Sequence, residues 1–416
     1  MGSASVRFIL TPLIDANLYG DDIDISDFVS TDSLPSISSF IDSEDYDIGI
    51  FSFGSIQIVC DNSTGGFNDF SDSRSVFNFY RDLSRLRVVF TETEITRDAS
   101  GIVTASTATD TTLFRGLIRD EATRFDPVRD SVTFEVLSLE SILSNVRIPP
   151  GQVVDGMLTT AAILAVLDDV KLDALIDVDP LNITPDLNLV VDNGGYFDAL
   201  NGLDAIKQLL LATNSVLRIN AANEILISDR SVDDAEPTIN LYGKNDLSGR
   251  ENIIDLTEFN IGFHRIANSA KSGSIESNDS GSITELGLRQ KSIDLQFITS
   301  EATLQEIVDR VVSDFVIPKL ECKVRVPMSL GSDVSLLQKV NINYPLALEP
   351  GGDFLPVVGG TSYGDTAAPY PIETGSISIL PTTLFKIIEI EHDLNSMESV
   401  LKLRQAGTGF EDGYTS

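Results

Sequence analysis

The stretch LFRGLIRDEATRFDPVRDSVTFEVLSLESIL, from Leu113 to Leu143, contains two strand patterns separated by a turn. Residues 113–118 are apolar enough for a half-buried strand, and the charged residues 119–130 include the turn-forming pair Asp126-Pro127. Residues 132–136 then alternate apolar and polar side chains, which is the period of a strand with one buried face. The stretch therefore predicts a β-hairpin.

A helix is expected directly after this hairpin. Ser138 is the expected N-cap, because its hydroxyl accepts a hydrogen bond from an amide of the first helical turn. Glu140 lies in that first turn, where the helix dipole favours a negative charge.

A second stretch near the C-terminus repeats the pattern. The sequence LFKIIEIEHDLNSMESVLKLRQ, from Leu384 to Gln405, opens with the same Leu-Phe-basic triplet and continues as an apolar strand. A polar turn at residues 392–396 precedes a second alternating strand, with Met397, Ser399, Leu401 and Leu403 on one face. The two hairpins predict two related β domains.

The composition is that of a soluble globular protein with sizeable cores. The chain has 416 residues, 42% hydrophobic side chains and a mean hydropathy near zero. It contains no run of ~20 apolar residues, the length that a membrane-spanning helix needs. The N-terminus lacks the basic start and apolar run of a signal peptide. We therefore expect no membrane segment.

The charge balance is strongly acidic. The formal net charge is −34 at pH 7, and the acidic residues are spread along the chain, which favours a solvated surface. Such a field repels phosphate backbones, so nucleic-acid binding is not expected unless a local basic patch overrides it.

Residues 1–145 form the first expected domain, which is rich in strands. The polar run 99–112 is expected to be a hairpin tip or a mobile loop, and residues 62–66 a turn. Short strands separated by turns favour a barrel or a sandwich. Besides the hairpin above, strands are expected at Val6–Leu10, Ile23–Val29, Tyr46–Phe53, Ser55–Cys60 and Leu86–Phe90.

Residues 146–250 form an expected α+β insert. A helix is predicted over residues 159–170 and another over residues 200–210, because apolar side chains recur at helical spacing in both. Residues 180–193 are expected to be an irregular connector. Strands at residues 216–219 and 224–228 flank a polar turn.

Residues 251–405 form the second expected β domain, followed by a tail at 406–416. It contains a strand at 252–266 and an amphipathic helix at 302–316, capped by Thr299 or Ser300 and ended by Pro318. The small polar run 268–282 is expected to be a flexible hairpin tip or exposed loop. Further strands are expected at Cys322–Val326 and Lys339–Asn343. The Pro- and Gly-rich segment 344–381 is either an extended loop ordered by a partner or a disordered one.

The sequence predicts no catalytic, cofactor-binding or metal site, and hence no enzyme. The acidic clusters 21–27 and 43–47 are either solvated segments or calcium sites, but they lack the glycine and distal glutamate of an EF-hand. His264 and His392 lie outside any metal-ligand spacing, and neighbours in Glu391-His392-Asp393 point to opposite faces of a strand. Cys60 and Cys322 are expected to be buried thiols, since one pair is no disulfide framework.

The order of these segments resembles the hub proteins of bacteriophage tails and baseplates. The resemblance rests on IDISDFV from Ile23, on the hairpin at Leu113–Leu143 and on the helix-then-hairpin element LDAIKQLLLATNSVLRINAANEILISDR. It continues through SEATLQEIVDRVVSDFVIPKLECKVRVP, LLQKVNINYP and the closing hairpin, and so covers most of the chain.

The resemblance implies a mainly β chain with two related tube-like β-barrel or sandwich domains and smaller α+β domains. It also implies a homotrimer at the tail tip of a virion, with no cofactor, that joins the six-fold tail tube to three-fold tip proteins. Expected partners are the tail tube or distal tail protein ring, the tape measure protein and a central fibre or spike. The alternatives are a hexameric distal tail protein and an acidic glycan-active enzyme or adhesin.

Overall fold

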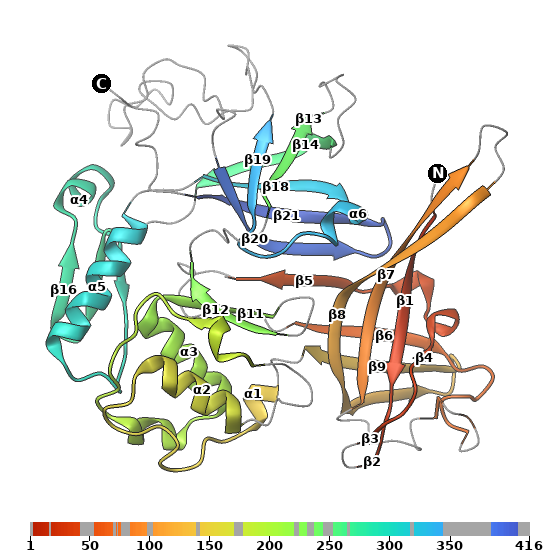
Figure 1. Ribbon diagram of the computed structural model, residues 1–416, viewed down its shortest axis with the longest axis horizontal. Coiled ribbons are helices and arrows are strands. Elements are labelled where there is room, and N and C mark those ends of the chain that lie inside the picture. The colour runs from red at the N-terminus through yellow and green to blue at the C-terminus, as the bar shows by residue number, and fades with distance from the viewer. Residues whose placement is uncertain are drawn as a thin grey trace.

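A computed structural model describes residues 3–15, 18–41, 54–69, 72, 74–75, 84–97, 103–138, 142–169, 178–219, 224–230, 237–243, 253–263, 267–316, 320–343 and 384–406. Over these residues the protein is mainly β, with two large sheets and smaller α+β parts, which confirms the expected fold class. Figure 1 shows the two large sheets and a helical region beside them.

The first large sheet closes on itself and is called the first barrel. Its strand order is β4-β1-β7-β8-β9-β6, and an antiparallel bridge between Val29 and Cys60 joins the segment after β4 to β6. Alternate residues fill its interior, and Val132, Phe134 and Val136 are fully buried as their alternation predicts. Its strands are β1 (Ser3–Thr11), β4 (Ile23–Asp24), β6 (Ser55–Asp61), β7 (Arg85–Arg97), β8 (Val103–Asp126) and β9 (Ser131–Ser138).

The second large sheet is called the second barrel. Its order is β19-β13-β14-β18-β21-β20, and a further pairing of β19 with β20 closes the circle. Its core contains Val324, Ile387 and Leu401. Its strands are β13 (Ile239–Gly243), β14 (Ile253–Phe263), β18 (Leu320–Pro327), β19 (Lys339–Asn343), β20 (Leu384–Asp393) and β21 (Glu398–Gln405), and α6 (Met328–Gly331) follows β18.

Both barrels have the same circular strand order. When the six strands of each are numbered along the chain, both circles read 2-1-4-5-6-3. Each predicted hairpin consists of the fifth and sixth strands of its barrel in chain order, β8–β9 and β20–β21. One difference concerns the first strand, because β1 is antiparallel to its two neighbours whereas β13 is parallel to its own.

The described residues among 142–230 and 267–316 share a third core and are called the helical module. Helix α3 begins at an Asn201 cap and ends at Asn214, whose φ of 54° is left-handed. Ser300 caps α5, as predicted. The elements are α1 (Ile142–Asn145), α2 (Thr159–Asp169), α3 (Gly202–Thr213), α4 (Ser280–Leu286), α5 (Glu301–Phe315), β10 (Ile183–Thr184), β11 (Ser215–Ile219), β12 (Ile225–Asp229), β15 (Ser269–Ser272), β16 (Ile275–Asn278) and β17 (Gln290–Ser292).

Strand β5 (Ser36–Phe40) connects all three parts. It leaves the first barrel after β4 and pairs antiparallel with β20 of the second barrel. Ile37 nevertheless belongs to the core of the first barrel, where it is 1% exposed. Ile41 donates its amide to the Ile388 carbonyl at 2.9 Å and packs against Val216 of β11 and Leu337.

Three expectations for the first barrel are wrong. Residues 23–29 do not form one strand, because the Asp24 carboxylate accepts hydrogen bonds from Ser26 and a 3₁₀ helix follows at Ser26–Phe28. Strand β8 continues to Asp126, so the turn is confined to 127–130, and it begins at Val103 within the expected tip or loop. Ser138 ends β9 instead of capping a helix, since its amide donates to Gly54.

Of the two alternatives for residues 268–282, the exposed loop is wrong, and a hairpin is present. These residues form β15, β16 and the start of α4, and Asn268 is fully buried. The Asn268 side chain donates to the Gly287 carbonyl at 2.8 Å and accepts from the Arg289 amide at 2.7 Å, so a polar residue is satisfied in the core. The small hairpin β2 (Leu13–Asp15) and β3 (Leu18–Tyr19) completes the fold.

The boundaries at residues 145 and 250 stay a prediction. The structure places α5 in the core of the helical module, although the sequence grouped it with the second β domain. The expected strand 46–53, the acidic cluster 43–47, His264, the segment 344–381 and tail residues 407–416 lie outside the described residues.

Replacement of Ile37 by alanine tests the connecting role of β5. We expect Ile37→Ala to lower the free energy of unfolding by about 2–5 kcal/mol, because it empties part of the first core beneath a strand of the second sheet. Ser38→Ala, at the exposed neighbouring position, is the control. Denaturant unfolding of both variants measures this, and equal midpoints would contradict the assignment.

Candidate assembly surfaces

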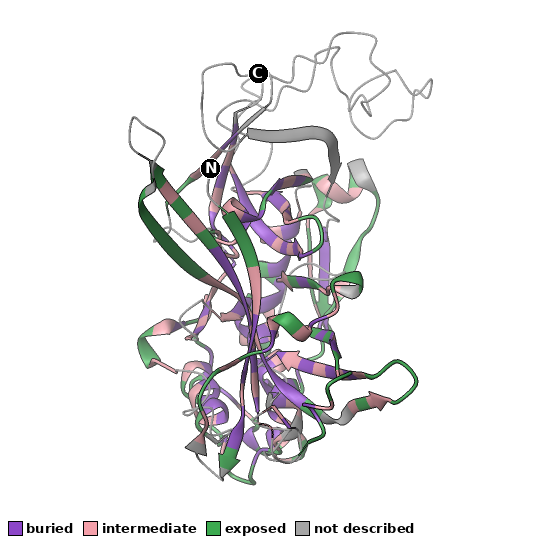
Figure 2. Cartoon of the chain, turned by 90° about the vertical axis from the view of Figure 1, so that its right-hand side faces the viewer, coloured by how far each residue is buried: buried purple, intermediate pink, exposed green. Residues whose placement is uncertain are grey.

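The β7–β8 hairpin extends beyond the first barrel as an arm. It consists of Thr91–Arg97, residues 103–112 of β8 and the paired start of β1, Ser3–Ser5 (Figure 1). All side chains from Thr104 to Asp110 and from Ser3 to Ser5 are exposed, so the ribbon has solvent on both faces (Figure 2). A ribbon without a core of its own is marginally stable in water. The arm therefore presents a surface suited to contact with another chain.

The arm also has open strand edges. β1 pairs with β4 only at Ile9 and Leu10, and β8 pairs with β9 only from Gly116 onward. Within the part of the chain that the structure describes, the outer edges of Ser3–Arg7 and of residues 103–115 have no strand beside them. Open edges offer backbone donors and acceptors to a further strand.

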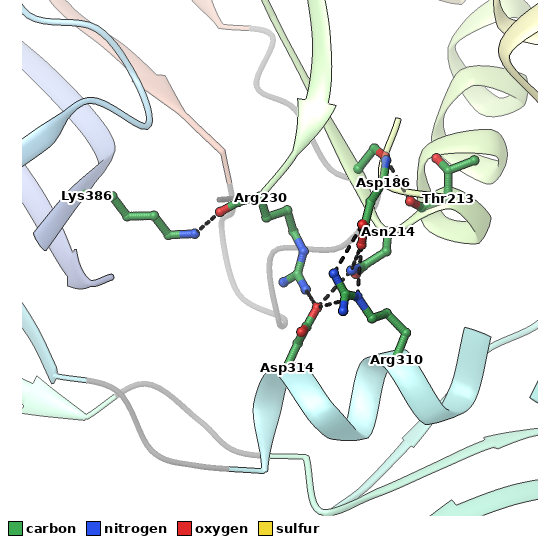
Figure 3. Close-up of polar contacts among 8 residues, drawn as sticks. Asp186, Thr213, Asn214, Arg230, Arg310, Asp314 and Lys386 are labelled. Carbon is green, nitrogen blue, oxygen red and sulfur yellow. Dashed lines mark hydrogen bonds and ion pairs between the residues drawn. The ribbon is translucent and has the colours of Figure 1, made fainter. Parts of the chain in front are cut away.

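A polar junction lies where the helical module meets the second barrel (Figure 3). Asn214, at the end of α3, donates to Asp186 at 3.0 Å and to Asp314 of α5 at 2.8 Å. Arg230, after β12, donates to the same Asp314 oxygen at 2.7 Å. Arg310 contacts both oxygens of Asp186, at 3.0 and 3.1 Å.

The junction is buried enough for its charges to depend on one another. The Arg230 side chain is 8% exposed, and burial lowers its pKa while Asp314 counteracts that shift. Lys386 of β20 donates to the backbone carbonyl of Arg230, which ties the helical module to the second barrel. Removal of one partner of a buried ion pair lowers the free energy of unfolding by several kcal/mol, because the other charge stays buried without its partner.

The residues that the sequence singled out do not come together as a catalytic centre. His392 is buried and its Nδ1 lies 2.8 Å from the Ser399 hydroxyl. Glu391 instead accepts from Ser36, and Asp393 accepts from Ser396 in the following turn. The three side chains therefore serve separate structural contacts.

Cys60 and Cys322 are buried free thiols in different barrels, and burial raises the pKa of Cys60 to about 12. In the cluster 21–27, Asp22 pairs with Arg87 and Asp24 with Ser26. No group of three His, Cys, Asp or Glu side chains arranged for a metal occurs among the described residues. Within the same residues, no helix is long and apolar enough to cross a membrane.

The sequence did not indicate the polar junction. Its contacts join residues that are 28 to 124 positions apart, and each of them looks like an ordinary polar surface residue in its own segment. Only the weak helix-capping preference of Asn214 is a local signal.

Comparisons with known proteins identify the fold. Neither a scan against protein-family models nor a search of curated proteins finds a match. Among solved structures, the tail protein from Neisseria meningitidis MC58 matches with a TM-score of 0.54 at 10% identity, over 99% of this chain and 99% of that chain. The fold of this chain is therefore that of a tail protein, which confirms the resemblance seen in the sequence at the level of the fold.

Two further solved structures are similar at lower scores. Prophage tail protein gp18 from Listeria monocytogenes EGD-e has a TM-score of 0.48 at 11% identity, over 97% of this chain and 95% of that one. The 43 kDa tail protein of prophage MuSo2 from Shewanella oneidensis has a TM-score of 0.46 at 11% identity, over 96% and 97%.

Removal of one junction charge should loosen the helical module. We expect Asp314→Asn to lower the free energy of unfolding by about 3 kcal/mol, because the buried Arg230 loses its carboxylate. Hydrogen exchange should become faster in α5 and β12. Asp309→Asn, at an exposed position of α5, is the control and should stay within about 0.5 kcal/mol. Equal exchange in both variants would refute the assigned role.

His392 should make the second barrel sensitive to acid. Burial lowers the pKa of His392 from 6.5 to about 4. Between these values the unfolded chain binds a proton that the folded chain does not, so stability falls as the pH falls through this range, by up to about 3 kcal/mol. His392→Gln should lack this part of the pH dependence. The measurement is the free energy of unfolding of both proteins between pH 7 and pH 4. If it depends on pH equally in wild type and His392→Gln, the assignment is contradicted.

Proposed function

We propose that the protein is a structural component of a bacteriophage virion, namely a trimeric hub at the tail tip. The observation that carries this proposal is the presence of two barrels with one strand order, 2-1-4-5-6-3, in a single chain. The fold shared with a tail protein over the full chain supports the location.

Symmetry explains why two similar barrels are useful. Closed rings repeat the same contact around an axis. Three copies of this chain carry six barrels, and six barrels match a six-fold tail tube while the whole assembly retains three-fold symmetry. The hub thereby adapts the tube, or a distal tail protein ring, to a three-fold fibre or spike.

The proposed ring encloses the channel through which the tape measure protein and DNA leave. The net charge of −34 supports this role, because an acidic wall repels the phosphate backbone and lets DNA pass without adhering. The arm and its open edges suit contacts between copies. The role is structural and involves no enzymatic step.

The mass and symmetry of the purified protein test the proposal. We expect light scattering to give three times the 45.1 kDa of one chain, and class averages of tail tips to show a three-fold ring at the end of the tube. A six-fold ring would instead indicate the distal tail protein. A monomer that cleaves glycans would indicate the enzyme alternative, and either result would overturn the hub.

A further inference from the structure

The two barrels share a set of residues as well as a strand order. The fifth strand of each barrel, counted along the chain, contains the triplet Leu-Phe-basic. This triplet ends at Arg115 in β8 and at Lys386 in β20. Arg115 lies directly opposite Arg87 of β7, and Lys386 lies directly opposite Lys339 of β19. Each barrel thus carries one pair of basic residues across its fourth and fifth strands.

The side chains beside these pairs are equivalent as well. Phe114 lies opposite Val88 in the first barrel, and Phe385 lies opposite Val340 in the second. All four belong to or pack against the barrel cores. Because neighbours in a strand face opposite sides, the basic pairs lie on the outer surfaces of the barrels.

In the second barrel this outer position is occupied by another part of the same chain. Lys386 is 7% exposed and donates to the carbonyl of Arg230, at the edge of the helical module. A lysine so deeply buried is stable only with polar partners, and here the partner segment supplies a backbone acceptor. The basic pair of the second barrel is therefore part of a contact between modules.

In the first barrel the equivalent position carries more basic residues and is partly exposed. Arg85 and Arg7 share the outer face with Arg87 and Arg115, and we call these residues the arginine face. The side chains of Arg7 and Arg87 are 37% and 31% exposed. Figure 2 shows the molecule from the side of the first barrel.

The arginine face is held in place within the monomer. Arg7 donates to the Thr91 hydroxyl at 3.0 Å and pairs with Asp110, while Arg87 pairs with Asp22. The Arg85 guanidinium lies 3.7 Å from the centroid of the Tyr19 ring. Side chains that are already ordered lose little entropy when a partner binds.

Its residues nevertheless repel one another. Like charges directly opposite in a sheet are destabilising, as with Arg87 and Arg115. Burial, followed by the nearby Arg87 and Arg85, lowers the pKa of Arg115. The border of the face is acidic, with Asp22, Asp24 and Asp110, and these carboxylates together with the net charge of −34 oppose nucleic acid.

We propose that the arginine face is the docking site for a neighbouring copy of this chain, whose carboxylates and carbonyl oxygens approach it as the helical module approaches Lys386 in the second barrel. In the proposed ring, first and second barrels alternate. The basic pair of each second barrel then contacts the helical module of its own chain, and the basic pair of each first barrel contacts a neighbouring chain. The acidic surface of a second copy complements the arginines. This inference rests on the proposed trimer.

Charge reversal tests the docking site. We expect Arg87→Glu/Arg115→Glu to weaken association at least about tenfold, because the neighbour's acidic surface then meets like charge. The matched control is Arg124→Glu/Arg129→Glu, which reverses two exposed arginines, one near the far end of β8 and one in the turn after it, and should associate like wild type. Light scattering over a dilution series measures both, and circular dichroism verifies folding.

Two further measurements separate the outcomes. Wild-type association should weaken between about 0.1 M and about 1 M NaCl, since salt screens exposed charges, and Arg87→Lys/Arg115→Lys should still form trimers even where the glutamate variant fails to fold. A glutamate variant that stays trimeric, or a lysine variant that does not associate, would refute the docking site but not the proposed hub. Wild type that is monomeric overturns the hub itself. Duplex DNA that binds wild type but not the glutamate variant, with trimers unaffected, would assign the face to nucleic acid.

Discussion

The pairing of β5 with β20 is the constraint on which the rest of the structure depends. This short strand contributes a buried isoleucine to the first core and a row of backbone hydrogen bonds to the second sheet, and the next residue, Ile41, makes an apolar contact with the helical module. Two barrels joined only by a flexible linker would move independently, because small polar interfaces between domains permit motion. A strand that pairs with the second sheet and buries a side chain in the first core removes that freedom. The spacing of the barrels is thereby fixed within the chain itself.

The polar junction complements this apolar connection. Buried charges contribute less to stability than well-packed apolar groups, but they accept few alternative arrangements. Asp314 receives hydrogen bonds from Asn214 and Arg230, which belong to different segments of the helical module. The junction therefore specifies the orientation of α5 relative to β12, and Lys386 transmits that orientation to the second barrel. For a component of the proposed ring, a single defined angle between modules matters more than additional stability.

Regular periods in the sequence were sufficient to predict much of the fold. The alternation of Val132, Phe134 and Val136 and the helical spacing in α5 both report burial on one side, and both elements form as expected. The composition of segment 268–282 favours a loop, because it does not reveal that the buried Asn268 side chain is satisfied by Gly287 and Arg289. The sequence does not predict β5 for a similar reason, because the strand with which it pairs lies about 350 positions away. The junction and the arginine face also depend on residues from separate segments of the chain. Only the repeated Leu-Phe-basic triplet can be recognised in the sequence itself.

The distance between β5 and β20 has a consequence for synthesis of the chain. Ser36 and Glu391 are 355 positions apart, so at roughly 5–20 residues per second the partner of β5 leaves the ribosome about 20–70 s later. The remaining strands of the first barrel, up to β9, are complete long before that moment. β5 therefore waits as a nascent strand with an unpaired edge, the kind of segment that chaperones protect and that mispairs between neighbouring chains. Until translation reaches the closing hairpin, the second barrel lacks β20 and β21, and the connection through β5 cannot form.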